Sequence, residues 1–218
     1  MKIGIFGGTF NPIHYGHLRG AEEVREKLEL NKILFIPSGK PPLKAEDITG
    51  TKHRYEMTRL AIANNPFFEL SDIECKKKGK SYTVETIERL KKTNPEYEYY
   101  FILGIDAFLD IPNWWKPKRL VTLTNFIIIS RPGYAFVDLQ MSPYMEISRR
   151  FFKALDNMEK AMYITKLRSD KIVILLSTIP IEISSTEIRK LSKQGKSIKY
   201  LLPAEVQSYI INNKLYRC

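Results

Sequence analysis

Residues 2–17 read KIGIFGGTFNPIHYGH, and this stretch decides the expected fold. Lys2–Phe6 is apolar and too short for a helix, so we expect a buried strand. Gly7 and Gly8 then permit a tight turn in which the backbone can approach a bound group closely. Apolar residues recur with helical spacing immediately afterwards, at Leu18, Ala21, Val24 and Leu28. The chain is therefore expected to pass from a strand, through a glycine-rich turn, into a helix.

The same alternation of strand and helix continues along the chain. Further strands are expected at 32–36, 68–73, 99–103, 126–129 and 171–176. Further helices are expected at 53–63, around 84–90, at 185–194 and from 203 to about 213. Apolar strands that alternate with helices predict an α/β fold, a Rossmann-like doubly wound parallel sheet with flanking helices.

A sheet of this kind binds ligands outside the carboxyl ends of its strands, near the point where the strand order reverses. The loops after Phe6, Pro37, Leu103 and Leu176 are therefore where we expect the site. Three of these four loops hold the most unusual local sequences of the chain.

The region from about 134 to 170 breaks the alternation. Its apolar residues recur with helical spacing, at Tyr144, Ile147, Phe151, Leu155, Met158 and Met162. We expect one long amphipathic helix here, inserted into a single domain that spans 1–218. The apolar stripe needs a partner surface, in its own domain or in another subunit, so a homo-oligomer is left open.

Composition restricts the classes of partner. No apolar run reaches the roughly 20 residues of a membrane-spanning helix, and the first residues are too short and glycine-rich for a signal peptide. We therefore expect a cytoplasmic protein with no membrane partner. The formal charge is +11, which favours anionic partners. No recognition helix or aromatic-studded binding strand accompanies this charge, so we expect phosphate esters and no nucleic acid.

The turn at 7–17 has the chemistry of an anion site. His14 and His17 lie at the expected entrance of a helix, where free N–H groups and the helix dipole attract phosphate. The turn matches neither the dinucleotide fingerprint nor the phosphate loop that ends in Gly-Lys-Ser/Thr. A purely structural turn is one alternative and a metal site another. Only His53 and two distant cysteines could complete a metal ligand set, so no metal ligand is assigned.

A second motif, ISSTEIR at 183–189, follows the strand expected at 171–176. Ser184 or Ser185 can cap the next helix, and Glu187 can close a capping box with Ser184, which explains a lone instance of this motif. The functional alternative is that hydroxyls, free N–H groups and the fork of Arg189 all face one anion. We expect the two motifs to converge on a single triphosphate.

Together these motifs resemble the signatures G-x-[FT]-[DN]-P-x-H-x-G-H and I-S-S-T-x-[IL]-R of a nucleotidyltransferase superfamily. Within it, the chain most resembles the bacterial nicotinate-nucleotide adenylyltransferases, over most of its length except about 134–170. Further matching segments are PPLK at 41–44, TKHRYEM at 51–57, GKSYTVET at 79–86, GID at 104–106, IPNW at 111–114 and RPG at 131–133. Asn11, Leu43 and Glu85 depart from the family pattern, which more often has Asp, His and Asp there.

The resemblance implies transfer of AMP from ATP to nicotinate mononucleotide, giving deamido-NAD and pyrophosphate, with Mg²⁺ bound to ATP. It implies ATP-binding roles for Gly7, Gly8, Thr9, Phe10, His14, His17, Gly104, Asp106, Ser184, Ser185, Thr186 and Arg189. It implies substrate-binding roles for Lys44, Tyr82, Thr83, Trp114 and Arg131. Catalytic roles fall to His14, His17, Lys44 and Arg189.

Two other functions stay open on the sequence. A sister transferase would use another phosphate ester, such as phosphopantetheine or nicotinamide mononucleotide. A phosphopantetheine acceptor leaves the segments around Tyr82 and Trp114 unexplained. A non-catalytic protein would bind the nucleotide without forming pyrophosphate.

Overall fold

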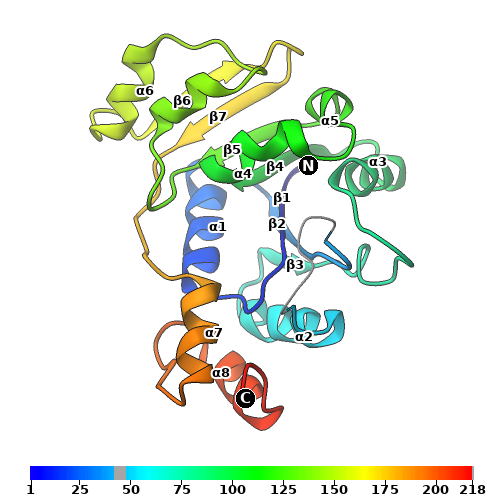
Figure 1. The fold of residues 1–218 in the computed structure, drawn as a ribbon. Coiled ribbons are helices and arrows are strands. Elements are labelled where there is room, and N and C mark those ends of the chain that lie inside the picture. Colours follow the sequence, from blue (N-terminus) through cyan, green and yellow to red (C-terminus); the bar gives the residue numbers. More distant parts are fainter. Residues whose placement is uncertain (42–47, 218) are drawn as a thin grey trace.

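A seven-stranded sheet forms the centre of the computed structural model, which describes residues 1–41 and 48–217 (Figure 1). Its strands lie in the order β3 (Phe68–Leu70), β2 (Lys32–Pro37), β1 (Lys2–Gly8), β4 (Glu98–Gly104), β5 (Asn125–Ile129), β7 (Ile172–Leu176) and β6 (Met162–Lys166). All neighbours pair in parallel except β6, which is antiparallel to β7. The predicted doubly wound α/β sheet is confirmed, with one antiparallel edge strand added.

Helices cover both faces of this sheet because the strands alternate their apolar side chains. In β4, Tyr99, Phe101 and Leu103 face one core, and Tyr100 and Ile102 face the other. The first core is covered by α3 (Thr83–Thr93), α4 (Ile105–Asp110), α5 (Pro117–Leu123) and α6 (Arg149–Asp156). The second is covered by α1 (Tyr15–Lys27), α2 (Thr51–Ile62), α7 (Ser185–Lys193) and α8 (Ala204–Asn212). Short 3-10 helices η1 (Ile111–Asn113) and η2 (Phe136–Met141) complete the described elements.

The last two helices lie at one end of the molecule. Figure 1 shows α7 and α8 beside α2, on the side of the sheet away from α6. The longest described helix, α1, has 13 residues. No helix in the described part of the chain is long and apolar enough to span a bilayer.

The expected long helix across 144–162 is wrong. Only α6 is helical there, and the chain then reverses through Met158, whose φ of 59° lies in the left-handed region. The following residues form β6, which pairs with β7 along its whole length. This pairing supplies hydrogen-bond partners to the outer edge of β7, which a helix could not do. The expected strand at 68–73 is likewise shorter, because turns begin at Asp72, whose carbonyl accepts a bond from the Lys76 N–H.

The contact surface of α6 gives a test of this correction. Phe152 is 1% exposed against the first core, whereas Met158, part of the expected helical stripe, is 77% exposed. We expect Phe152→Ala to lower the free energy of unfolding by about 3–5 kcal/mol through lost burial and a cavity. Met158→Ala should change it by less than about 0.5 kcal/mol. Denaturant unfolding of both variants checks this, and a large cost at Met158 would contradict the end of the helix at Asp156.

Candidate functional site

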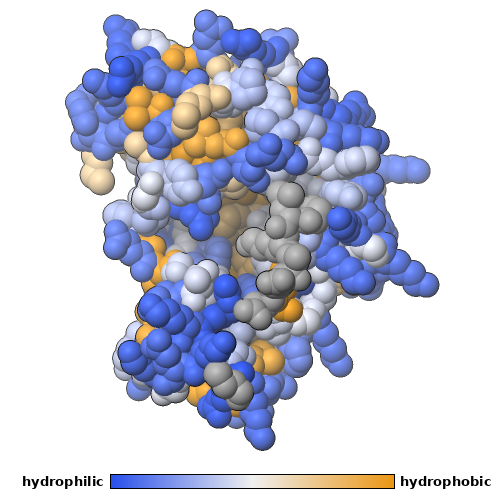
Figure 2. Space-filling model, viewed as in Figure 1, coloured by the Kyte–Doolittle hydropathy of each residue, from blue (hydrophilic) through white to orange (hydrophobic). Residues whose placement is uncertain are grey.

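A cleft of about 1660 Å³ opens at the carboxyl ends of the parallel strands. It is lined by the loops after β1, β2, β4 and β7, the four loops singled out from the sequence. β1 and β4 are neighbours from the two halves of the sheet, so the cleft lies at the topological switch point. In Figure 2 the face is hollowed between the part over α4 and α6 and the part over α7 and α8.

Nearly all the site residues expected from the sequence line this one cleft. They are Gly7, Gly8, Thr9, Phe10, His14, His17, Tyr82, Thr83, Gly104, Asp106, Trp114, Arg131, Ser184, Ser185, Thr186 and Arg189. Lys44 and the neighbouring Leu43 lie outside the described residues, so the expectation for Lys44 stays a prediction. The lining also includes Ser38, Glu74, Ser81, Asn113 and Trp115, which were not selected from the sequence.

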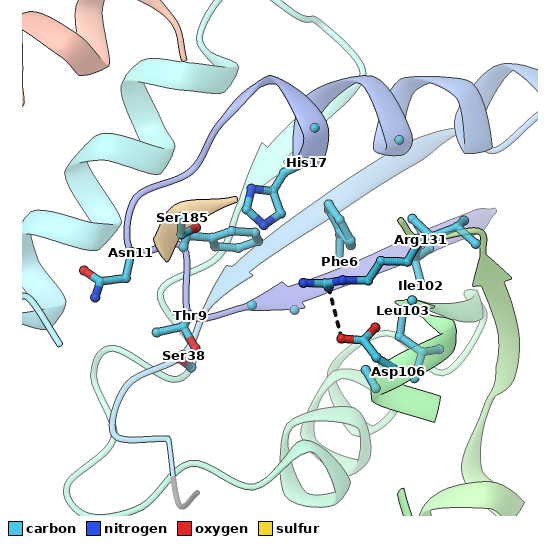
Figure 3. Close-up of a pocket in the computed structure, with 18 of the residues that line it drawn as sticks. Phe6, Thr9, Asn11, His17, Ser38, Ile102, Leu103, Asp106, Arg131 and Ser185 are labelled. Atoms are coloured by element: carbon cyan, nitrogen blue, oxygen red, sulfur yellow. Dashed lines mark ion pairs between the residues drawn. The ribbon is translucent and has the colours of Figure 1, made fainter. Parts of the chain in front are cut away.

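The two histidines form the start of α1. His14 is the N-cap residue, its backbone N–H donates to His17 Nδ1 at 3.3 Å, and the ring centroids lie 3.7 Å apart. Because Nδ1 of His17 accepts this bond, a neutral His17 carries its proton on Nε2. The edges of Phe6 and Phe10 pack against the His17 ring. Figure 3 shows this ring pointing from α1 into the cleft.

His14 is buried more deeply than its partner. It is 6% exposed, and its Nδ1 has no hydrogen-bond partner among the described residues. Burial, followed by the positive charge of Arg131, lowers the pKa of His14 from 6.5 to about 4. The side chain is therefore a neutral imidazole at pH 7, able to donate one hydrogen bond and accept another.

The second motif lies directly against the first. Ser184 caps α7 and accepts the Glu187 N–H at 3.1 Å, as the capping alternative required. Ser185 Oγ donates to the Pro12 carbonyl at 2.8 Å, and Arg189 Nη1 donates to the Asn11 carbonyl at 2.9 Å. The cap at Ser184 is therefore present, and the bonds from Ser185 and Arg189 bring the starts of α1 and α7 into one wall of the cleft.

The opposite wall carries a carboxylate and a guanidinium. Asp106 Oδ2 lies 3.3 Å from Arg131 Nη1, the ion pair drawn in Figure 3. Asp106 Oδ1 is buried without a hydrogen-bond partner among the described residues. A Cβ at position 104 would lie 2.6 Å from this oxygen, so any larger residue there would displace the carboxylate. A buried carboxylate oxygen of this kind is suited to accept hydrogen bonds from ligand hydroxyls.

Two aromatic rings face each other at the far end of the cleft. The ring centroids of Tyr82 and Trp115 are 5.3 Å apart with planes inclined by 30°, and Trp115 is 51% exposed. Trp114, which was selected from the sequence, also lines the cleft, but its Nε1 donates to Asp110 and its ring packs edge-on against Phe101. Only the structure distinguishes the two adjacent indoles.

A buried arginine ties three backbone segments together beneath the cleft. Arg54 is 1% exposed and donates to the carbonyls of Thr9, Gly39 and Thr49 at 2.8, 2.8 and 2.9 Å. It thus links the loop after β1 to both flanks of the segment 40–48. The sequence marked this arginine only as part of a family segment, because two of its partners, the carbonyls of Thr9 and Gly39, are distant in sequence.

A largely buried carboxylate lies in the cleft near Tyr82 and Thr83. Glu74 accepts the Thr86 hydroxyl at 2.7 Å, and burial raises the pKa of its carboxyl. Thr86 belongs to α3, the helix that begins just after Tyr82. Glu74 thereby fixes the start of α3 relative to the loop that precedes it, a role with no local signal in the sequence.

Solved structures with the same fold include an adenylyltransferase from a parasite. A Plasmodium falciparum nicotinic acid mononucleotide adenylyltransferase complexed with NaAD matches with a TM-score of 0.74, covering 99% of this chain and 97% of that one. The same Plasmodium enzyme complexed with APC matches with a TM-score of 0.71, covering 99% of this chain and 96% of that one. Both are 24% identical to this chain, so they establish the fold alone.

Sequence comparison goes further than the fold. The profile of the Cytidylyltransferase-like family matches residues 5–191. A protein of Geotalea daltonii, described as "probable nicotinate-nucleotide adenylyltransferase", is 44% identical and covers 99% of this chain and 98% of its own length. A protein of Desulfitobacterium hafniense with the same description is 42% identical and covers 99% of this chain and 96% of its own length. The chain therefore belongs to the Cytidylyltransferase-like family and, within it, to the nicotinate-nucleotide adenylyltransferases.

Proposed function

We propose that this chain joins the AMP moiety of ATP to nicotinate mononucleotide, giving deamido-NAD and pyrophosphate. The observation that carries the proposal is the contact of the two motifs in one cleft, through Ser185 to Pro12 and Arg189 to Asn11. We further propose that residues 1–218 form one nucleotidyltransferase domain, in which about 134–170 is an insertion beside β7.

The reaction needs neither a general base nor a covalent intermediate. A phosphate oxygen of the mononucleotide, already ionised at neutral pH, attacks the α-phosphorus of ATP. The bond from that phosphorus to the bridging oxygen breaks, and pyrophosphate leaves with the electron pair. Catalysis then consists of in-line positioning and stabilisation of charge. The cleft supplies donors of the right kind, which are imidazoles, hydroxyls, two guanidiniums and two helix N-termini.

ATP is proposed to bind across the switch point of the sheet. Its triphosphate would lie between the starts of α1 and α7, where His14, His17, Ser184, Thr186 and Arg189 are the donors. The turn formed by Gly7, Gly8, Thr9 and Phe10 would pass beneath it. The ribose would lie at Gly104, with its hydroxyls donating to Asp106 Oδ1, the buried oxygen that has no other partner among the described residues.

The acceptor is proposed to occupy the other half of the cleft. Tyr82 and Trp115 would hold the nicotinate ring, because a flat ring with a cationic nitrogen stacks well on aromatic faces. Thr83 and Trp114 would close this end, while Arg131 and Lys44 would contact phosphate. Arg131 has to exchange part of its ion pair with Asp106 for that contact.

Mg²⁺ is proposed to enter as part of the ATP substrate. No group of three or more His, Cys, Asp or Glu in the described chain could hold a metal by itself. Mg²⁺ characteristically keeps waters and binds substrate phosphates, with few protein ligands. An ion bound in this way neutralises phosphate charge, and the residues of the cleft need only hold the phosphates that carry it.

The proposed activity is tested by product identification. The chain is incubated with ATP and Mg²⁺ plus nicotinate mononucleotide, nicotinamide mononucleotide or phosphopantetheine, and the products are separated and weighed by mass spectrometry. We expect deamido-NAD with an equal amount of pyrophosphate, and the highest kcat/KM for the nicotinate substrate. ATP binding without pyrophosphate would favour a nucleotide sensor, and preference for phosphopantetheine would favour the sister transferase.

His17 gives a direct test of the donor arrangement. His17→Ala should lower kcat by about 10²–10³, the usual effect of losing one donor to a charged transition state. His53→Asn is the matched control, because His53 bonds to Tyr209 and does not line the cleft. Steady-state kinetics of both variants check this, and near-normal turnover of His17→Ala would remove His17 from the mechanism.

The neutral state of His14 gives a test through stability. Its folded pKa of about 4 lies below the unfolded value of 6.5, so the unfolded chain takes up this proton first as the pH falls. The stability that His14 contributes is therefore lost between pH 6.5 and 4. We expect the unaltered chain to lose about 3 kcal/mol more than His14→Asn over this range. Denaturant unfolding at each pH measures this, and parallel profiles would contradict a buried neutral His14.

A further inference from the structure

Tyr216, which follows α8, reaches the loop that leads to the cleft histidines. Its hydroxyl donates to Asn11 Oδ1 at 2.8 Å, across 205 residues of sequence. We propose that Tyr216 is a positioning residue for the adenylyl transfer, which acts by holding Asn11 and through it the loop 9–14. This inference rests on the proposed function.

Asn11 is a junction of three distant segments. Its side-chain oxygen accepts the Tyr216 hydroxyl and also the Thr49 N–H at 3.3 Å. Its backbone carbonyl accepts Arg189 Nη1 from α7 at 2.9 Å. The residue is 5% exposed, and Figure 3 shows it on the loop between β1 and α1. Displacement of this one side chain would therefore loosen contacts with all three segments.

The loop at Asn11 needs such support because its own backbone is unfavourable. Phe10 has a φ of 47°, in the left-handed region that bulky residues rarely adopt. A conformation of this kind persists only where surrounding contacts determine it. Three residues beyond Asn11, His14 forms the N-cap of α1 and bonds to His17. The Tyr216 bond is thus one residue from the unfavourable backbone and three from the first cleft histidine.

The surroundings of Tyr216 keep it a neutral donor. Leu215 and Tyr216 pack against the second core. Burial raises the pKa of the Tyr216 phenol to about 12, against the opposite effects of a hydrogen bond with the Thr49 side chain and of the charges of Arg189 and Arg54. The hydroxyl therefore remains protonated at physiological pH and can donate to Asn11. A phenylalanine would fill the same space and remove only the hydroxyl, with its hydrogen bonds to Asn11 and to the Thr49 side chain.

Tyr209 offers a matched comparison within the same part of the chain. It lies on α8, and its hydroxyl hydrogen-bonds His53 Nδ1 of α2 at 3.0 Å. Neither Tyr209 nor His53 lines the cleft. Tyr209→Phe therefore removes a hydroxyl contact of α8 without touching Asn11. A general loss of stability would appear in both variants, and a positioning effect only in Tyr216→Phe.

The experiment compares Tyr216→Phe, Asn11→Ala, their double variant and Tyr209→Phe in the deamido-NAD assay, with Tm measured for each. We expect Tyr216→Phe to lower kcat about tenfold, the usual scale for one buried hydrogen bond, with KM for both substrates changed less than about twofold. The double variant should be no slower than Asn11→Ala alone, because both changes break the same link. Tyr209→Phe should stay within about twofold of the unaltered chain.

Three results would overturn the inference. The first is a Tyr216→Phe variant with unchanged kcat, and the second is a double variant whose losses multiply. The third is an equal loss in Tyr216→Phe and Tyr209→Phe that follows Tm. Amide hydrogen exchange of residues 9–17 gives a readout independent of activity, expected to quicken in Tyr216→Phe only. If the unaltered chain makes no dinucleotide, the proposed function fails, and unchanged exchange then rejects the positioning role separately.

Discussion

The geometry of the site depends on two hydrogen bonds between α7 and the loop that precedes α1. Ser185 donates to the carbonyl of Pro12 and Arg189 to that of Asn11, across 173 and 178 residues. Each helix start alone would attract an anion only weakly, because the helix dipole acts within its first turn. These bonds bring the starts of α1 and α7 to one cleft, where the proposed polyphosphate would meet the donors of both helices. The sheet supplies the distance between β1 and β7 that leaves room for it.

Much of the fold could be predicted because its signals are local. Short apolar runs marked six parallel strands, and a parallel sheet has its ligand loops at one edge. The error at 144–162 arose because helical spacing also fits an irregular apolar segment by chance. What decides that segment is the open edge of β7, where residues 162–166 find backbone partners. This pairing joins two separate segments of the chain, and the spacing of apolar residues does not indicate it.

Some residues of the site could likewise be predicted from local sequence, and others only from contacts between distant segments. Glycines, histidines and capping hydroxyls are recognised by their spacing at strand–helix junctions, and they line the cleft. The supporting residues are recognised only in space. Arg54 and Tyr216 contact atoms that lie more than ten residues away in sequence, and Glu74 is paired with Thr86 through a loop. Trp114 packs against the first core, whereas Trp115 is exposed in the cleft, and the local sequence does not show which of the two indoles is buried.

Arg54 and Arg189, which both donate to the loop between β1 and α1, show how the fold keeps positive charge near the proposed anion site. Arg25, Arg59 and Arg119 on the outer helices are paired with carboxylates, which largely cancel their charge. Arg54 and Arg189 instead donate to main-chain carbonyls and threonine hydroxyls, with no ion pair to any described residue. Carbonyl oxygens fix a guanidinium without neutralising it. The same bonds that shape the loop therefore leave the two guanidinium charges uncancelled beside the proposed polyphosphate site, so that loop geometry and positive potential have a single structural cause.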